Sequence, residues 1–212
     1  MIKKNIDFIK SRIDSTCLQN KIEPSAVSLL AATKTQNVET IKEAVNFGVK
    51  ICGENYLKEA EAKIPLIKNV DWHFIGHLQS NKAKKAVELF DCIESVDTVK
   101  LARKINDAAT DKFPIFLSVN IGEEENKFGV KPNAVEDFFL EVKELENLDV
   151  KGLFCMAPYV KDTSKYFQTM SNLSTKLKLS ELSMGMSNDY LTAIKNGSTI
   201  VRLGSSIFGE RD

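Results

Sequence analysis

The chain has 212 residues, of which 43% are hydrophobic, and this length is typical of one domain with one sizeable core. Its 29 Lys and Arg residues balance 29 Asp and Glu residues, and a net charge of +0 argues against a nucleic acid or an acidic membrane as partner. No apolar run approaches the length of a signal peptide or a membrane span. We therefore expect a cytoplasmic protein, most simply a monomer.

The first predicted element is an amphipathic helix over roughly residues 2–20, in which Ile2, Ile6, Ile9 and Ile13 recur at helical spacing. We expect this helix to pack on the outside of the fold or to cover its bottom, because the elements that follow form a regular series of their own. The four cysteines are single, without a CxxC pair or neighbouring histidines. They predict buried thiols rather than a zinc site or a disulfide framework.

Eight short apolar runs then alternate with segments of helical periodicity. The helix after the first run has Asn37 to cap its start and Gly48 to end it, and Asp97 is a suitable N-cap for the helix after the fourth run. The eight runs are residues 27–33, 49–52, 72–76, 92–95, 114–121, 150–157, 181–185 and 199–204.

Strands that alternate with helices predict a parallel sheet of the α/β class, and eight such strands most simply close into a (β/α)8 barrel of the TIM type. The alternative is an open doubly wound sheet, which usually has fewer strands and a glycine-rich first turn. No GxGxxG follows the first strand. We therefore expect residues 1–212 to form a single barrel domain, with functional groups at the carboxyl ends of its strands.

Lys34 places an ammonium group at the end of the first apolar run. Side chains alternate between the two faces of a strand, so Leu30, Ala32 and Lys34 share one face. If the small Ala32 points into the barrel, the lysine does as well, and its amine projects into the barrel mouth. The other interpretation is a strand-end lysine that extends to water. Polar segments that follow other strands favour a shared site: GENY (53–56), HFIGHLQSNK (73–82), SMGMSND (183–189) and RLGSSIFG (202–209).

The last two segments predict an anion site. GMSND places small and hydroxyl residues at the opening of a helix, where backbone N–H groups and the helix dipole favour a negative charge. LGSS offers Gly204, which has no side chain to block an approach, and the hydroxyls of Ser205 and Ser206. The loops after strands seven and eight form the recurring phosphate cradle of this fold. The alternative is two ordinary turns.

Arg202 is a charged residue in an otherwise apolar strand, on the same face as Gly204. It needs an acceptor, because an unpaired buried charge is costly. One interpretation is a structural ion pair with an acid such as Glu54, and the other is a hydrogen bond to a ring heteroatom or an anionic ligand. An amine, a phosphate cradle and a barrel mouth together suggest a phosphorylated aldehyde held as a Schiff base. Pyridoxal phosphate (PLP) is the first candidate, and a sugar phosphate in a class I aldolase is another.

Five segments of the chain resemble the signature segments of the pyridoxal phosphate homeostasis protein family, in that family's order. The resemblance extends from about Val27 to Asp212 and implies a fold similar to the barrel domain of alanine racemase and of fold-type III decarboxylases. The chain departs from the family in a shorter stretch MAPYVKDTSKYF and in its end at GERD, where relatives often continue with a tyrosine. The five segments are AATKT, GENY, WHFIGHLQSNK, ELSMGMSND and STIVRLGSSIFGERD.

The same resemblance implies roles for individual residues in binding PLP. Lys34 would form the internal aldimine, and Arg202 would face the pyridine nitrogen. The other cofactor-binding residues would be Asn55 beside PLP, His77 near the ring face, and Ser187, Gly204 and Ser205 at the phosphate.

The expected function is intracellular PLP homeostasis, in which the protein buffers PLP and delivers it to apo forms of PLP-dependent enzymes without being an enzyme itself. The alternative is an amino-acid racemase or decarboxylase of fold type III. Such enzymes add a β domain that supplies catalytic residues, whereas only SSIFGERD follows the eighth predicted strand. An arginine at the ring nitrogen also favours its unprotonated form, a weaker electron sink. Racemases of this fold share that arginine, so the ring partner alone does not exclude catalysis.

Overall fold

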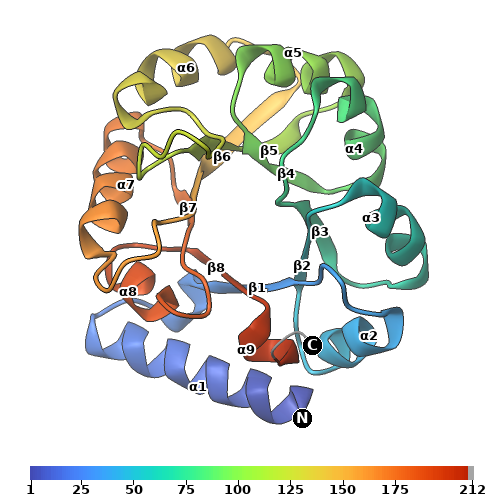
Figure 1. The fold of residues 1–212 in the computed structure, drawn as a ribbon, viewed down its shortest axis with the longest axis vertical. Helices are drawn as coiled ribbons and strands as arrows, with labels where there is room; N and C mark the ends of the chain where they lie inside the picture. The colour runs from blue at the N-terminus through green and yellow to red at the C-terminus, as the bar shows by residue number, and fades with distance from the viewer. Residues whose placement is uncertain (210–212) are drawn as a thin grey trace.

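The structure is a computed structural model that describes residues 1–209. Its strands are β1 (Ser28–Ala32), β2 (Ile51–Glu54), β3 (Asp71–Phe74), β4 (Cys92–Val96), β5 (Phe113–Val119), β6 (Leu148–Cys155), β7 (Glu181–Ser183) and β8 (Ile200–Leu203). They form a closed barrel in which each strand pairs in parallel with the next, and β8 pairs with β1 (Figure 1). The predicted barrel is confirmed, and no strand boundary differs from its prediction by more than two residues.

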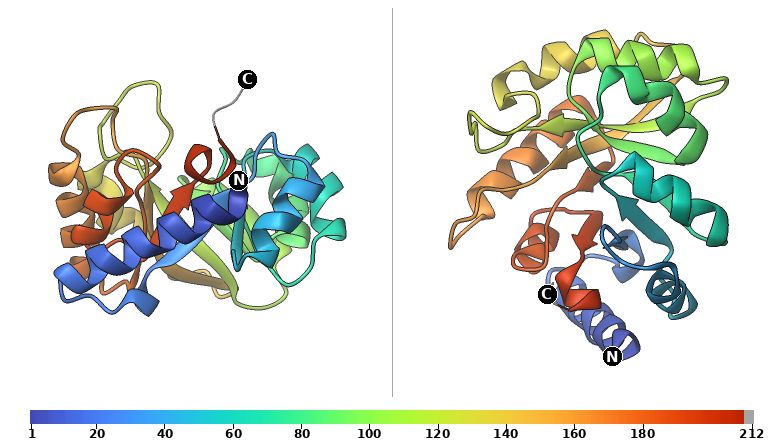
Figure 2. Two further views of the ribbon diagram at one scale, coloured as in Figure 1. Left: turned by 90° about the horizontal axis from the view of Figure 1, so that it is seen from below. Right: turned by 45° about the vertical axis from the view of Figure 1, so that its right-hand side comes forward.

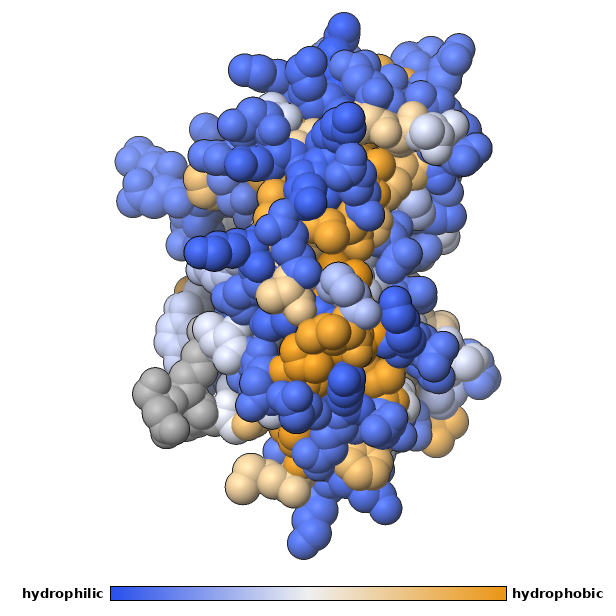
Figure 3. Space-filling view, turned by 90° about the vertical axis from the view of Figure 1, so that its right-hand side faces the viewer, coloured by the Kyte–Doolittle hydropathy of each residue, from blue (hydrophilic) through white to orange (hydrophobic). Residues whose placement is uncertain are grey.

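Helices surround the ring of strands on its outside (Figure 1). They are α1 (Ile2–Gln19), α2 (Val38–Asn46), α3 (Leu57–Lys63), α4 (Ala83–Leu89), α5 (Val99–Ala108), α6 (Val135–Val142), α7 (Ser164–Leu177), α8 (Tyr190–Lys195) and α9 (Ser205–Phe208). On the side of α2, α3 and α4, hydrophobic residues gather in a band down the middle of the surface, between hydrophilic residues (Figure 3). Within residues 1–209, none of the helices is both long enough and apolar enough to span a bilayer.

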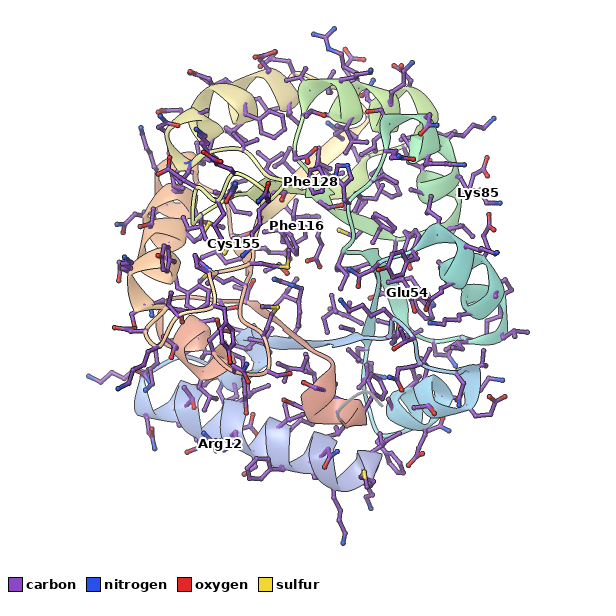
Figure 4. The ribbon with its side chains drawn as sticks, viewed as in Figure 1. Arg12, Glu54, Lys85, Phe116, Phe128 and Cys155 are labelled. Atoms are coloured by element: carbon purple, nitrogen blue, oxygen red, sulfur yellow. The ribbon has the colours of Figure 1, made fainter. Side chains whose placement is uncertain are left out.

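Two apolar layers hold the barrel together, because alternate strand residues face opposite sides. Leu30 belongs to the inner cluster, whereas its neighbour Ala31 belongs to the layer between the strands and the helices. Figure 4 shows Phe116, another member of the inner cluster, within the ring of strands. The buried members of the inner cluster are Leu30, Ile75, Cys92, Phe116, Phe154 and Ile200.

Helix α1 lies outside the barrel against α8 and α9, as one of the two sequence predictions had it (Figure 1). Its buried face carries the four isoleucines at helical spacing. Two polar side chains add specific contacts: Asn5 Nδ2 donates to the backbone oxygen of Ile207 at 2.9 Å, and Lys10 Nζ donates to that of Phe47 at 3.2 Å. The first contact ties the amino-terminal helix to α9, and the second ties it to the end of α2.

The predicted helix ends are correct for α2 and wrong for α5. The Asn37 side chain accepts the Thr40 N–H at 2.8 Å, and Gly48 follows α2 with a φ of +86°, a conformation that favours glycine. At α5 the N-cap is Thr98, whose hydroxyl accepts the Leu101 N–H, and not Asp97. Both residue types cap helices well, so local preference alone does not choose between neighbours.

The four cysteines are free and buried, as predicted. Burial raises the pKa of Cys52 and of Cys155 to about 12 in each case. A thiol with so high a pKa carries almost no thiolate at neutral pH. These cysteines are therefore core residues and not nucleophiles.

Candidate functional site

A cavity of about 630 Å³ opens at the carboxyl ends of the strands. The loops after β5, β6 and β7 rise together on that side of the barrel (Figure 2, left). Six of the seven residues predicted as a site line this cavity, although they come from distant parts of the chain. They are Lys34, Asn55, Ser187, Arg202, Gly204 and Ser205.

Lys34 follows the end of β1 and lines the cavity, half-buried. Leu30 and Ala32, four and two residues before it on the same face, pack in the inner cluster, so the predicted inward face of β1 is correct. The turn that carries Lys34 is fixed by its neighbours. Thr33 donates its hydroxyl to the Glu54 carboxylate at 2.7 Å, and Thr35 donates its N–H to Glu59 Oε2 at 2.9 Å.

Arg202 lines the same cavity and is 5% exposed. Its guanidinium donates to Ser183 Oγ at 3.0 Å and to the backbone oxygen of Cys155 at 2.6 Å, and lies 4.3 Å from the ring centroid of Phe154. Burial lowers the pKa of Arg202, and the nearby Glu94 charge opposes that shift. The two hydrogen bonds, to Ser183 and Cys155, hold the guanidinium in one orientation.

The predicted alternative partner of Arg202, Glu54, is wrong. Glu54 is fully buried on the outer side of β2, toward α3 (Figure 4), and Lys63 Nζ lies 2.7 Å from its Oε1. Strand alternation explains the error, because Gly53 faces Leu30 inside the barrel and the next residue must face outward.

The acid that is connected to Arg202 is Glu94, through Ser183, and the sequence analysis did not identify it. Ser183 Oγ bridges the two, because it accepts from Arg202 and donates to Glu94 Oε2 at 2.5 Å. The other oxygen of Glu94 lies 2.6 Å from His73 Nδ1. A polar chain thus crosses the barrel interior below the cavity. Glu94 is an acid in the buried strand Cys92–Val96. Because a fully buried acid is rare unless it is paired, its position in that strand could have identified it.

Small and hydroxyl residues form one wall of the cavity. Ser205 Oγ donates to Ser187 Oγ at 3.1 Å, and the Ser206 N–H donates to the same oxygen at 3.4 Å, so the loops after β7 and β8 meet here. A Cβ at Gly204 would come no closer than 3.5 Å to Ala32, an ordinary contact. Packing within the protein therefore does not require glycine at 204, which leaves open space beside the two serines.

Asn55 follows β2 at another side of the cavity. Its Oδ1 is buried and has no hydrogen-bond partner, which is uncommon for a buried polar atom. Its backbone is packed tightly against the segment that follows β3, since a Cβ at Gly76 would lie 2.2 Å from the Asn55 backbone oxygen. The backbone that carries the unsatisfied oxygen is thus fixed beside the cavity.

His77 is the one predicted site residue that does not line the cavity. Its ring stacks on Phe128 with centroids 3.5 Å apart, and its Nδ1 lies 3.7 Å from Asp97 Oδ2. Its role beside a ring face stays a prediction.

The loop after β6 also lines the cavity, which the sequence reasoning did not anticipate. It contributes Met156 and Tyr159, which are 45% and 95% exposed, together with Lys161. Lys127 joins them from the loop after β5. A polar loop without regular structure has no periodicity from which its direction could be read.

The comparisons with known proteins agree with this architecture. Residues 3–212 match the family model described as alanine racemase, N-terminal domain. The pyridoxal phosphate homeostasis protein of Pasteurella multocida is 37% identical over 100% of this chain and 98% of its own length. That of Schizosaccharomyces pombe is 41% identical over 97% of this chain and 91% of its own length.

Solved structures extend the agreement to three dimensions. PipY of Synechococcus elongatus with PLP bound is 32% identical, with a TM-score of 0.80, over 95% of this chain and 100% of that one. An alanine racemase of Clostridium difficile is 15% identical, with a TM-score of 0.78, over 98% of this chain and 57% of that one, a likeness of fold. A closed eight-stranded barrel with these full-length relatives places the chain in the pyridoxal phosphate homeostasis protein family.

Proposed function

We propose that this protein binds PLP in the cavity at the barrel mouth, as a Schiff base with Lys34, and serves to buffer and deliver the cofactor. The observation that carries the proposal is the convergence of Lys34, Arg202 and the Ser187–Ser205 pair on one cavity. The names of the curated relatives and the PLP in the PipY structure support the identity of the ligand.

The residues present fit this cofactor. Asn55 offers a buried oxygen that needs a donor, and the space beside Gly204 would admit a group that the serine hydroxyls can bind. Arg202 would face the pyridine nitrogen, while its contacts to Ser183 and Cys155 keep it in place. PLP would supply an aldehyde and Lys34 the amine that condenses with it to a C=N bond, with the aldehyde oxygen leaving as water.

A carrier fits the cavity better than an amino-acid racemase or decarboxylase does. The loop side of the cavity is open to solvent, with Tyr159 almost fully exposed at its edge. An enzyme that forms reactive intermediates must exclude water, whereas a carrier must release its cargo. Apo forms of PLP-dependent enzymes are the expected recipients, and a cytoplasmic monomer remains our prediction for the protein itself.

Borohydride trapping tests the attachment site. Reduction of the PLP-loaded protein should convert the C=N bond to a secondary amine, and peptide mass spectrometry should find the phosphopyridoxyl group on Lys34. Lys34→Ala should bind PLP more weakly and give no adduct at position 34. An adduct confined to another lysine of the wild-type protein would refute this assignment.

Turnover and transfer assays separate the carrier from the enzyme. In deuterated water, the loaded protein should exchange no α-proton of a panel of L- and D-amino acids at ordinary enzymatic rates of about 1 per second or more. The same protein should restore activity to an apo PLP-dependent enzyme. Rapid turnover of any one amino acid would favour the racemase or decarboxylase instead.

A further inference from the structure

A compact ion network lies directly behind the turn that carries Lys34. Lys63, at the end of α3 and 7% exposed, places its Nζ 2.7 Å from Glu54 Oε1, 2.7 Å from Glu59 Oε2 and 2.9 Å from the backbone oxygen of Thr33. One ammonium group thus joins two carboxylates and the backbone of β1. None of these three charged side chains lines the cavity.

The network fixes the backbone on both sides of Lys34. Before it, the Thr33 hydroxyl donates to Glu54, and the Thr33 backbone oxygen accepts from Lys63. After it, the Thr35 N–H donates to Glu59. Each of these partners belongs to β2 or α3, so regular structure beside the turn, and not the turn sequence alone, determines its conformation.

The conformation held in this way is a costly one. Thr35 has a φ of +67°, and a β-branched residue in the left-handed region is an outlier. Close by, Glu54 Oε2 is buried without a hydrogen-bond partner. A left-handed threonine in the turn and an unpaired buried oxygen on the adjacent strand are thus two separate costs at one place. Such concentrations of strain are typical of functional sites.

Electrostatics support the same arrangement. Burial raises the pKa of Glu59, but hydrogen bonds from Lys63 and Thr35 and the charges of Lys63 and Lys34 outweigh it, and the net shift is downward. Glu59 is therefore ionised at neutral pH, as a strong acceptor for the Thr35 N–H.

We propose that Glu59 and Lys63 are positioning residues, which hold the turn from Thr33 to Thr35 so that the Lys34 amine meets the PLP aldehyde in a reactive orientation. This rests on the proposed function, since it concerns the rate of the same condensation, in which one water is lost. Misplacement of a reacting group by about 1 Å can slow a reaction about a hundredfold. The network should therefore control bond formation much more than binding.

The test compares two ligands in variants of the full chain. Pyridoxine 5′-phosphate keeps the ring and phosphate of PLP but has an alcohol where PLP has the aldehyde, so its dissociation constant reports binding alone. With PLP, the rate of the absorbance change and the borohydride-trapped fraction on Lys34 report the covalent step. Glu61→Ala is the matched control, because Glu61 is an exposed acid of the same helix that pairs with Lys85.

Glu59→Ala should slow the covalent step between about tenfold and a hundredfold, while binding of pyridoxine 5′-phosphate changes by no more than about twofold. Glu61→Ala should match wild type in both. Adding Thr35→Gly to Glu59→Ala should restore part of the rate, because glycine reaches a positive φ without steric cost. Glu59→Gln keeps an oxygen for the Thr35 N–H and should stay within about threefold of wild type, a test that does not require the alanine variant to fold.

Three results would overturn the inference: a wild-type rate in Glu59→Ala, an equal loss for both ligands, or a Glu59→Gln variant as slow as Glu59→Ala. The first would show that the network does not guide the amine, the second that it merely supports the fold, and the third that charge rather than position matters. A wild-type protein with no adduct on Lys34 is a different outcome, which would refute the proposed attachment instead.

Discussion

Two buried charge networks flank the cavity, and they reach it in different ways. Inside the barrel, Arg202 itself lines the cavity and connects through Ser183 to Glu94. Outside the barrel wall, Lys63 joins Glu54 and Glu59 and reaches the cavity only through the backbone of the turn that carries Lys34. The inner network can act on a ligand by its charge, and the outer one only by geometry.

The two networks also differ in how well their acids are satisfied. Glu94 accepts from Ser183 and lies beside His73, so it retains partners if Arg202 is removed. Glu54 depends on Lys63 and Thr33 for one oxygen, and its other oxygen has no partner. Burial accordingly raises the pKa of Glu54, although the contacts to Lys63 and Thr33 oppose the shift. The outer network should therefore be the more fragile of the two.

Removal of Lys63 should produce the largest loss of stability. Lys63→Met leaves Glu54 buried beside an apolar side chain, and breaking such a pair typically costs about 3–5 kcal/mol of unfolding free energy. Urea denaturation measures the loss. Lys58→Met, which changes an exposed lysine of the same helix, should stay within about 0.5 kcal/mol of wild type. A loss for Lys63→Met as small as that of the control would contradict the ranking of the networks.

Removal of Arg202 should affect the fold less and the ligand more. In Arg202→Leu, Ser183 and His73 still satisfy Glu94, and a loss of about 1–3 kcal/mol is expected in the same denaturation experiment. The absorption spectrum of bound PLP should shift, because the proposed partner of its ring nitrogen is gone. Arg103→Leu, an exposed arginine on α5, is the control for both measurements. An unchanged spectrum together with a loss as large as that of Lys63→Met would make the Arg202 network purely structural.

The sequence was sufficient for the fold and for the direction of Lys34, because both depend on local periodicity. Apolar runs separated by helical patterns specify the barrel, and alternation along β1 places Lys34 on the inner face with Leu30 and Ala32. In a parallel barrel the carboxyl ends of all strands lie on one face. The segments that carry Asn55, Ser187 and Arg202 therefore meet at one cavity.

The networks could not be predicted, because they depend on pairings between elements. The second strand was predicted to end at Cys52, whereas β2 continues to Glu54, so the outward direction of Glu54 was missed. Its partner Lys63 lies on the next helix, and no local pattern specifies which strand residue that helix end meets. Glu94 and Ser183 likewise lie 89 residues apart and meet only across the barrel interior.

The smallest expected effect concerns the pH dependence of stability, in which the two acids of the outer network, Glu59 and Glu54, differ. The pKa of Glu59 is lowered in the folded protein, so this group stabilises the fold above its unfolded pKa, and the contribution is lost as pH falls through the folded pKa. The pKa of Glu54 is raised, so its dependence on pH is the opposite, and its contribution is lost as pH rises through its folded pKa.

Because the pKa of Glu59 is lowered, Glu59→Gln should cost stability at neutral pH, by less than about 1 kcal/mol since the Glu59–Lys63 pair is partly exposed. Urea denaturation of both proteins between neutral pH and pH values below 4.5, the ordinary pKa of a glutamate, measures the difference. It should shrink toward zero with acidification, and a difference that grows instead would mean that Glu59 carries a raised pKa and does not support the lysine turn as an anion.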